Sequence, residues 1–125
     1  SEDPAQIAAV LDWEMATIGD PLADVGMLVM YWGRPGDVFP SDVHRITAAP
    51  GFLERSELLA AYERRIGRAL GDVGFYIAFA HFKLAVIVEG IVARHRAGAT
   101  VGEGFDQLEA IAPLLADAGL KGLQT

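Results

Sequence analysis

One stretch constrains the fold more than any other: residues 74–97, which are predicted to form a single long helix that is apolar on nearly every side in its first half. Such a helix must be covered on several sides, so we expect it to be the central helix of a bundle, ended by Gly98. Gly90 lies in its middle, where glycine costs about 1 kcal/mol relative to alanine, and we expect another backbone to pack closely there. Lys83 and Glu89 lie on the same helix and should each face a groove or a partner, because unpaired buried charges are costly.

Two further helices are predicted before this central one. Asp20 and Pro21 are typical of a helix N-terminus, as the N-cap and the first-turn residue, and apolar residues then follow with helical spacing as far as Trp32. Residues 54–70 have the clearest amphipathic pattern, with Gly71 as the expected C-cap.

The remaining segments give one more helix and two connections. An amphipathic helix is predicted over residues 105–118, and Pro113 inside it predicts a kink or a break. Residues 33–51 carry several Pro and Gly clusters and predict a long loop, a kind of segment that is usually functional or mobile. Residues 99–104 predict a flexible turn. The chain should therefore be mainly α, with four or five helices.

Only one strand is expected, over residues 7–11, a short apolar run with β-branched residues. A lone strand cannot satisfy its own backbone groups, and no partner strand precedes it in the 125-residue sequence. A chain of this length has room for one core and is too short for two. We therefore expect a single domain over residues 1–125, mainly α with one short N-terminal strand. Either something else pairs with that strand, or the chain is a fragment of a larger protein.

Composition limits the classes of function. The formal net charge of −7 argues against a broad nucleic-acid surface. The chain has no cysteine, which excludes disulfides and thiolate metal sites and makes a cytoplasmic location the default expectation. We expect no membrane partner, because the first residues are acidic and no uncharged apolar stretch approaches the roughly 20 residues of a membrane span.

Basic and imidazole side chains give weaker signals. His81, on the central helix, is expected to be a core or pocket residue rather than a metal ligand. Arg94, His95 and Arg96 end that helix, where positive charge is favoured by the helix dipole; contact with an anionic substrate is the alternative role.

Four carboxylates follow the predicted strand at short intervals: Asp12, Glu14, Asp20 and Asp24. Residues i and i+2 of an extended segment point to the same side, so Asp12 and Glu14 should project together. Two adjacent carboxylates repel each other unless a cation lies between them or one is protonated, and Mg²⁺ is often bound by one or two carboxylates with substrate phosphates and water. The pair is therefore a candidate Mg²⁺ site, and a solvated turn is the alternative. Asp20 favours the N-cap role, whereas Asp24 either complements the helix dipole or hydrogen-bonds a neighbouring loop.

The acidic stretch also resembles a known family. An apolar strand, Asp12-Trp-Glu14, and then Gly19-Asp-Pro-x-x-Asp-Val25 is similar to the metal-binding segment of the aminoglycoside phosphotransferase-like kinases. Later stretches resemble the subgroup similar to the kinase-like domain found beside acyl-CoA dehydrogenases: Pro50-Gly-Phe52, Glu57-Leu-Leu-x-x-Tyr62, Phe75-Tyr76, and Lys83-Leu-Ala-Val-Ile-Val-Glu-Gly90 with Arg94. The resemblance covers nearly the whole chain, but the later stretches are mostly packing residues.

The resemblance implies a role for each acidic residue. Asp12 would bind the Mg²⁺ that bridges the nucleotide phosphates, and Glu14 would lie near the same metal or the substrate. Asp20 and Asp24 would organise the turn behind the catalytic loop. The implied fold is the helical C-terminal part of a protein-kinase-like C-lobe. The implied cofactors, in the parent protein, are Mg²⁺ and ATP or GTP, with a small-molecule hydroxyl as the phosphoryl acceptor.

The sequence lacks several groups that catalysis requires in this family. Phosphoryl transfer also requires a phosphate-covering loop, a lysine on the phosphates, a catalytic aspartate and a second metal ligand. In this family the last two come from a His-Gly-Asp-x-x-x-x-Asn loop upstream of the strand, which this chain lacks, and Lys83 lies in a helix rather than on the required strand.

The chain therefore resembles the last third of a kinase. Alone, it should have no kinase activity, hold no cofactor tightly, and self-associate through apolar surface that the missing half would cover. The alternative is a non-catalytic helical binding or interaction module on the same scaffold.

Overall fold

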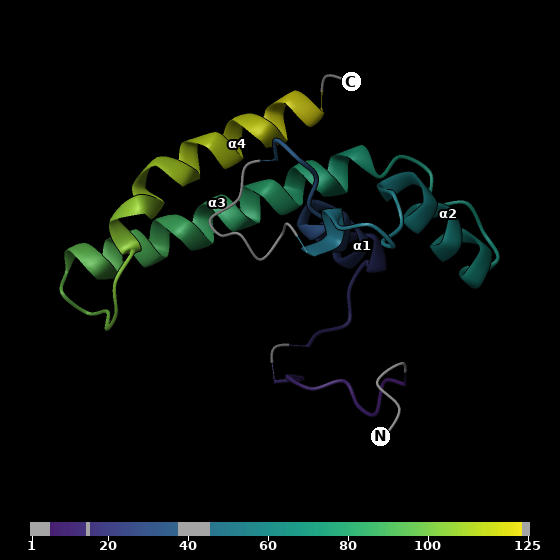
Figure 1. Ribbon diagram of the computed structural model, residues 1–125, viewed down its shortest axis with the longest axis horizontal. Coiled ribbons are helices and arrows are strands. Elements are labelled where there is room, and N and C mark those ends of the chain that lie inside the picture. Colours follow the sequence, from purple (N-terminus) through teal and green to yellow (C-terminus); the bar gives the residue numbers. More distant parts are fainter. Residues whose placement is uncertain (1–5, 15, 38–45, 124–125) are drawn as a thin grey trace.

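The computed structural model describes residues 6–14, 16–37 and 46–123. Its helices are α1 (Pro21–Tyr31), α2 (Arg55–Ile66), α3 (Gly74–Arg96), the 3-10 helix η2 (Phe105–Ala110) and α4 (Ile111–Gly122). Figure 1 shows α4 running beside α3, with α1 and α2 near the N-terminal end of α3. The prediction of a mainly α chain is confirmed.

The predicted N-terminal strand over residues 7–11 is not found. Residues 7–13 have no regular secondary structure, and the described residues contain no strand. The apolar pattern of this run favours a strand, but a strand forms only when a neighbour accepts and donates its backbone hydrogen bonds. In Figure 1 the segment runs away from the helices, so no described element is in place to pair with it.

The central position of α3 is confirmed. Both α1 and α4 pack against it, and the main core forms between them around Met30 of α1, Val88 of α3 and Leu115 of α4, which are at most 2% exposed. By length and composition alone α3 could cross a membrane, contrary to the expectation from the sequence. The core helix of a soluble protein meets the same criteria, and both α1 and α4 pack on α3.

A second apolar cluster joins α2 to the rest, around Val25, Val29 and Leu70. The predicted helix over 54–70 ends early, at Ile66, because Gly67 adopts a left-handed conformation (φ 71°) and closes it in place of Gly71. The residues after Gly67 leave the helix so that Leu70 can be buried, and its backbone N–H donates to Glu63 Oε1 at 2.9 Å.

The predicted helix over 105–118 is divided at residue 110. Residues 105–110 form η2 and α4 begins at Ile111, which places Pro113 in the first turn of α4. The N–H groups of a first turn have no helical partner, so a proline there loses no hydrogen bond. The predicted break is thus confirmed, on the N-terminal side of the proline.

Close backbone packing occurs at a different glycine from the one expected. A Cβ on Gly26 of α1 would lie 2.5 Å from both the carbonyl carbon and the oxygen of Tyr76. A Cβ on Gly90 would meet only the tip of the Arg94 side chain, at 3.6 Å. The prediction for Gly90 is therefore wrong within the described part of the chain, because the helices that cover α3 lie on its opposite face.

Candidate functional site

The acidic segment forms a compact local turn. The Trp13 indole Nε1 donates to the Val10 carbonyl at 2.7 Å, and the Ala16 N–H donates to the Trp13 carbonyl at 3.0 Å. Between them, Asp12 has a positive φ of 68°. A non-glycine residue rarely adopts this conformation, although aspartate tolerates it better than most. Such a backbone at an exposed carboxylate is a common feature of functional sites.

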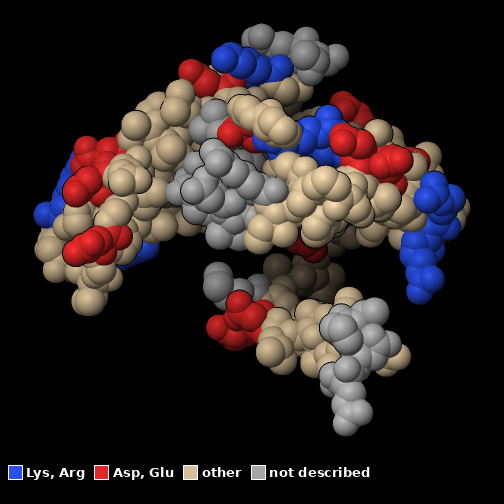
Figure 2. Space-filling view, in the orientation of Figure 1, with Lys and Arg blue, Asp and Glu red and all other residues tan. Residues whose placement is uncertain are grey.

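This turn changes the relation between Asp12 and Glu14. The expectation that they project to one side assumed an extended backbone, and the positive φ of Asp12 breaks that alternation. Both side chains are exposed, and Figure 2 shows acidic side chains on this segment, apart from the helices. The described residues contain no group of three or more His, Cys, Asp or Glu that could hold a metal. An exposed carboxylate pair fits Mg²⁺ only where phosphates and water complete its shell.

Asp20 is the N-cap of α1, as predicted. Its carboxylate accepts from the Leu22 N–H at 3.0 Å and, with its other oxygen, from the Tyr76 hydroxyl at 2.6 Å. The Tyr76 hydrogen bond, with the Leu22 N–H and the more distant Arg68, holds the pKa of Asp20 below its usual range, and the same bond raises the pKa of Tyr76. Asp20 is thus held as an anion by structural partners.

Tyr76 joins α1 to α3 at two points. Its hydroxyl binds Asp20, and its backbone lies against Gly26. The Gly-Asp-Pro-x-x-Asp-Val-Gly stretch therefore both begins α1 and fixes the crossing of α1 over α3. Sequence reasoning did not assign roles to Tyr76 or Gly26. A glycine inside an otherwise apolar helix was the available signal for the second.

Asp24 lies exposed in the first turn of α1. Within the described residues it has no hydrogen-bond partner or ion pair, so its favourable interaction with the helix N-terminus is the role that the structure supports.

The basic end of α3 is engaged by η2. His95 Nδ1 lies 2.9 Å from Thr100 Oγ1 and its Nε2 lies 3.0 Å from Asp106 Oδ1. Arg96 Nε donates to Glu109 Oε1 at 3.0 Å, which raises the pKa of Arg96 and lowers that of Glu109. Two members of the predicted basic patch are therefore used to hold η2 rather than presented to an anionic substrate.

His81 also has a structural role, as expected. Its Nδ1 lies 2.9 Å from the Ile77 carbonyl one turn earlier on α3, and the side chain is half-buried. A Cβ on Gly119 would lie 3.2 Å from the His81 Cβ, so His81 lies where α4 passes closest to α3.

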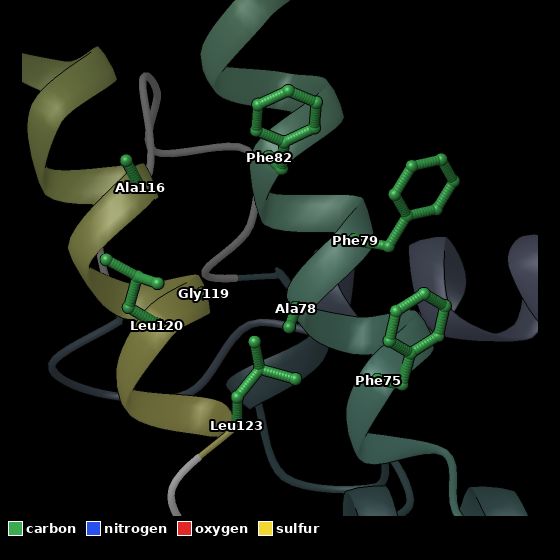
Figure 3. Close-up of a pocket in the computed structure, with 8 residues that line it drawn as sticks. All are labelled: Phe75, Ala78, Phe79, Phe82, Ala116, Gly119, Leu120 and Leu123. Carbon is green, nitrogen blue, oxygen red and sulfur yellow. The ribbon is translucent and has the colours of Figure 1, made fainter.

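An apolar groove, which the sequence did not predict, lies between α3 and α4 (Figure 3). Its volume is about 320 Å³ and its walls are almost entirely apolar. The lining residues are Phe75, Ala78, Phe79, Phe82, Ala116, Gly119, Leu120 and Leu123. None of these described lining residues carries a carboxylate, hydroxyl or imidazole, so they suit the binding of an apolar group.

Comparison with known proteins identifies the family of this chain. The sequence model of the phosphotransferase enzyme family matches residues 1–76, which include the acidic segment, α1 and α2. This chain belongs to the phosphotransferase enzyme family. The resemblance carried by the Asp-Trp-Glu and Gly-Asp-Pro motifs is thereby confirmed. No solved structure matches the chain.

Curated relatives narrow the subgroup. The chain is 30% identical over 122 residues to acyl-CoA dehydrogenase family member 11 of Gallus gallus, covering 94% of this chain and 16% of the relative. The human member 11 is 30% identical over 118 residues (93% and 15%), and the mouse member 10 is 30% identical over 131 residues (95% and 12%). The chain therefore spans about a sixth or less of the length of these relatives.

Proposed function

We propose that this chain is the C-terminal part of the catalytic lobe of a small-molecule phosphotransferase. In the longer protein the γ-phosphoryl group of ATP or GTP would pass to a hydroxyl group of a small molecule. Asp12 would be the main Mg²⁺ ligand and Glu14 would lie near the same ion. Bound Mg²⁺ would neutralise charge on the nucleotide phosphates.

The observation that carries this proposal is the family match across the acidic segment. The positive φ and exposure of Asp12 support it, because residues in sparsely populated backbone conformations cluster at functional sites. Asp20 has a structural role in this proposal, because both of its oxygens accept hydrogen bonds that hold the start of α1.

The contribution of the described residues would be positional. The Asp20 cap and the Gly26–Tyr76 contact fix the start of α1 against α3, and the acidic turn leads directly into that start. A turn anchored at one end holds its carboxylates in a narrower range of positions, which is what metal and phosphate binding require.

The test uses the longer protein that contains this segment. Mg²⁺-dependent ATP binding and turnover would be measured for wild type, Asp12→Asn, and Asp117→Asn as a matched control on the exposed surface of α4. Asp12→Asn should lower turnover by about a hundredfold or more, while Asp117→Asn should leave it unchanged. Equal nucleotide binding and turnover in wild type and Asp12→Asn would refute the assignment of Asp12.

A second candidate is a non-catalytic interaction module on the same scaffold, which the exposed apolar side chains of α3 favour. The open reading frame upstream separates the two. A His-Gly-Asp-x-x-x-x-Asn loop there, preceded by a strand lysine, supports the enzyme; its loss from an otherwise intact lobe supports the module. For either, we propose a cytoplasmic protein that does not bind nucleic acid.

A further inference from the structure

The face of α3 opposite the core is apolar and uncovered by the described residues. Phe75, Phe79, Phe82 and Val86 are 41–59% exposed and recur at intervals of four, three and four residues. This spacing places them in one stripe along the helix. Figure 3 shows the three phenylalanine rings in a row along α3, and Phe75 and Phe79 stack in parallel with centroids 6.3 Å apart.

The same stripe changes character towards the C-terminus of α3. After Val86 it continues through Gly90, Ala93 and Ala97, all with small side chains. Of the described residues, the tip of Arg94 alone lies within 4 Å of a Cβ placed on Gly90. A glycine in mid-helix costs about 1 kcal/mol relative to alanine, and no contact within the described part of the chain explains it. A second backbone passing close to Gly90 would explain it.

We propose that this face of α3 binds a second copy of the chain, with the two α3 helices antiparallel and the two-fold axis at Val86. Because the large residues precede Val86 and the small ones follow it, reversing one helix brings large against small. Phe82 then lies level with Gly90 of the other copy, and Phe79 with Ala93. The face is self-complementary, as an isologous contact requires.

Two charged residues lie at the edges of this stripe. Lys83 and Glu89 are three residues before and after Val86 and lie on opposite edges. In the antiparallel arrangement each edge of the stripe meets the same edge of the other copy, so these charges border the contact and do not pair across it; Lys83 leans over its own Phe79 ring at 5.8 Å. The direction of the two helices is therefore set by the packing of large against small side chains.

The available area is sufficient for a weak dimer. Each half-exposed phenylalanine offers roughly 100 Å² of further burial, and with Val86, the small residues and the rim of the α3–α4 groove we estimate about 1,000 Å² in total, near the lower bound for a specific interface. We therefore expect dissociation constants on the order of micromolar.

The test is sedimentation equilibrium of the full 125-residue chain with three variants and a control. Gly90→Leu fills open space in the monomer but blocks the partner helix, so it should raise helix stability and weaken dimerisation by at least about tenfold. Phe82→Ala removes the large side chain that lies level with Gly90 of the other copy and should weaken dimerisation by about tenfold. The double variant Phe82→Ala with Gly90→Leu again places a large residue level with a small one and should bind more tightly than Gly90→Leu alone. Ser56→Leu, which adds an exposed apolar residue on α2, should leave dimerisation unchanged.

Several results would overturn the proposal. One is a chain that stays monomeric at every soluble concentration. Another is a dimer that Gly90→Leu does not weaken, or one in which the double variant Phe82→Ala with Gly90→Leu is no tighter than Gly90→Leu alone. A monomer that instead binds lipid vesicles or an apolar dye through this face would also refute the self-complementary contact. None of these readouts depends on nucleotide or metal, so the proposed function can fail without affecting this one.

Discussion

Gly26→Ala tests the crossing of α1 over α3. The new methyl would lie 2.5 Å from two backbone atoms of Tyr76, where ordinary contacts begin at 3.4 Å. Backbone atoms inside a helix cannot rotate away, so α1 and α3 must separate by about 0.9 Å. A gap of this size forfeits a quarter to a half of the dispersion energy of the atoms lining it, and it opens both the Met30 cluster and the Val25–Val29 cluster.

We expect Gly26→Ala to lower the free energy of unfolding by about 1–3 kcal/mol through overpacking. This is the net effect, because the higher helix propensity of alanine adds up to about 1 kcal/mol of stability. Urea unfolding followed by circular dichroism, at concentrations where the chain is monomeric, measures this loss of stability. The unfolding free energy falls by about 1–2 kcal/mol per molar urea, so the unfolding midpoint should fall by roughly 1 M. Gly90→Ala is the matched control, since its Cβ meets only a flexible side chain at 3.6 Å, and it should be neutral or stabilising. A Gly26→Ala chain as stable as wild type would refute the close contact.

Three further outcomes follow from the structure. Leu115→Ala should lower the free energy of unfolding by about 2–5 kcal/mol, because Leu115 is fully buried. In the same urea assay Leu114→Ala should lower it by less than about 1 kcal/mol, because Leu114 is 46% exposed. Tyr76→Phe should raise the pKa of Asp20 towards its ordinary value in an NMR titration, and an unchanged titration would contradict the hydrogen bond. Because the pKa of Asp20 is lowered in the folded chain, the hydrogen bond stabilises the fold above the pKa of Asp20 in the unfolded chain, and this stabilisation is lost as the pH falls through the pKa in the folded chain. Asp12→Gly should unfold at the same or higher urea concentration than wild type, since glycine adopts a positive φ freely, and a large loss of stability would show that the carboxylate has a structural role.

Local signals predicted the helix starts well. Asp20 followed by Pro21 predicts the beginning of α1 because the cap and the proline act within one turn, and the structure has both in place. Pro113 predicted a break, and α4 begins two residues before it. The end of α2 was misplaced because two glycines, Gly67 and Gly71, both suit a C-cap, and only the burial of Leu70 decides between them.

The candidate site differs in geometry from the expectation. The family motif pointed to Asp12 and Glu14; the family is confirmed, and the assignment of these two residues stays a prediction. Their shared orientation was inferred from an extended backbone that the positive φ of Asp12 interrupts. Strand formation at residues 7–11 depends on a partner strand, so a favourable apolar pattern was not sufficient.

The sequence by itself determined that this chain is mainly α, that a long apolar helix is its centre, and that its acidic N-terminal segment resembles a phosphotransferase family. The first two conclusions rest on periodicity and capping, which act over a few neighbouring positions, and the third on a resemblance that the family match confirms. Only the tertiary structure decided which glycine is a helix contact, that Tyr76 binds Asp20, and which face of α3 is left open. Tyr76 lies 56 residues from Asp20 in the chain, and such pairings depend on how the helices cross, because a helix pattern fixes the faces that are apolar but not the partner that covers each one.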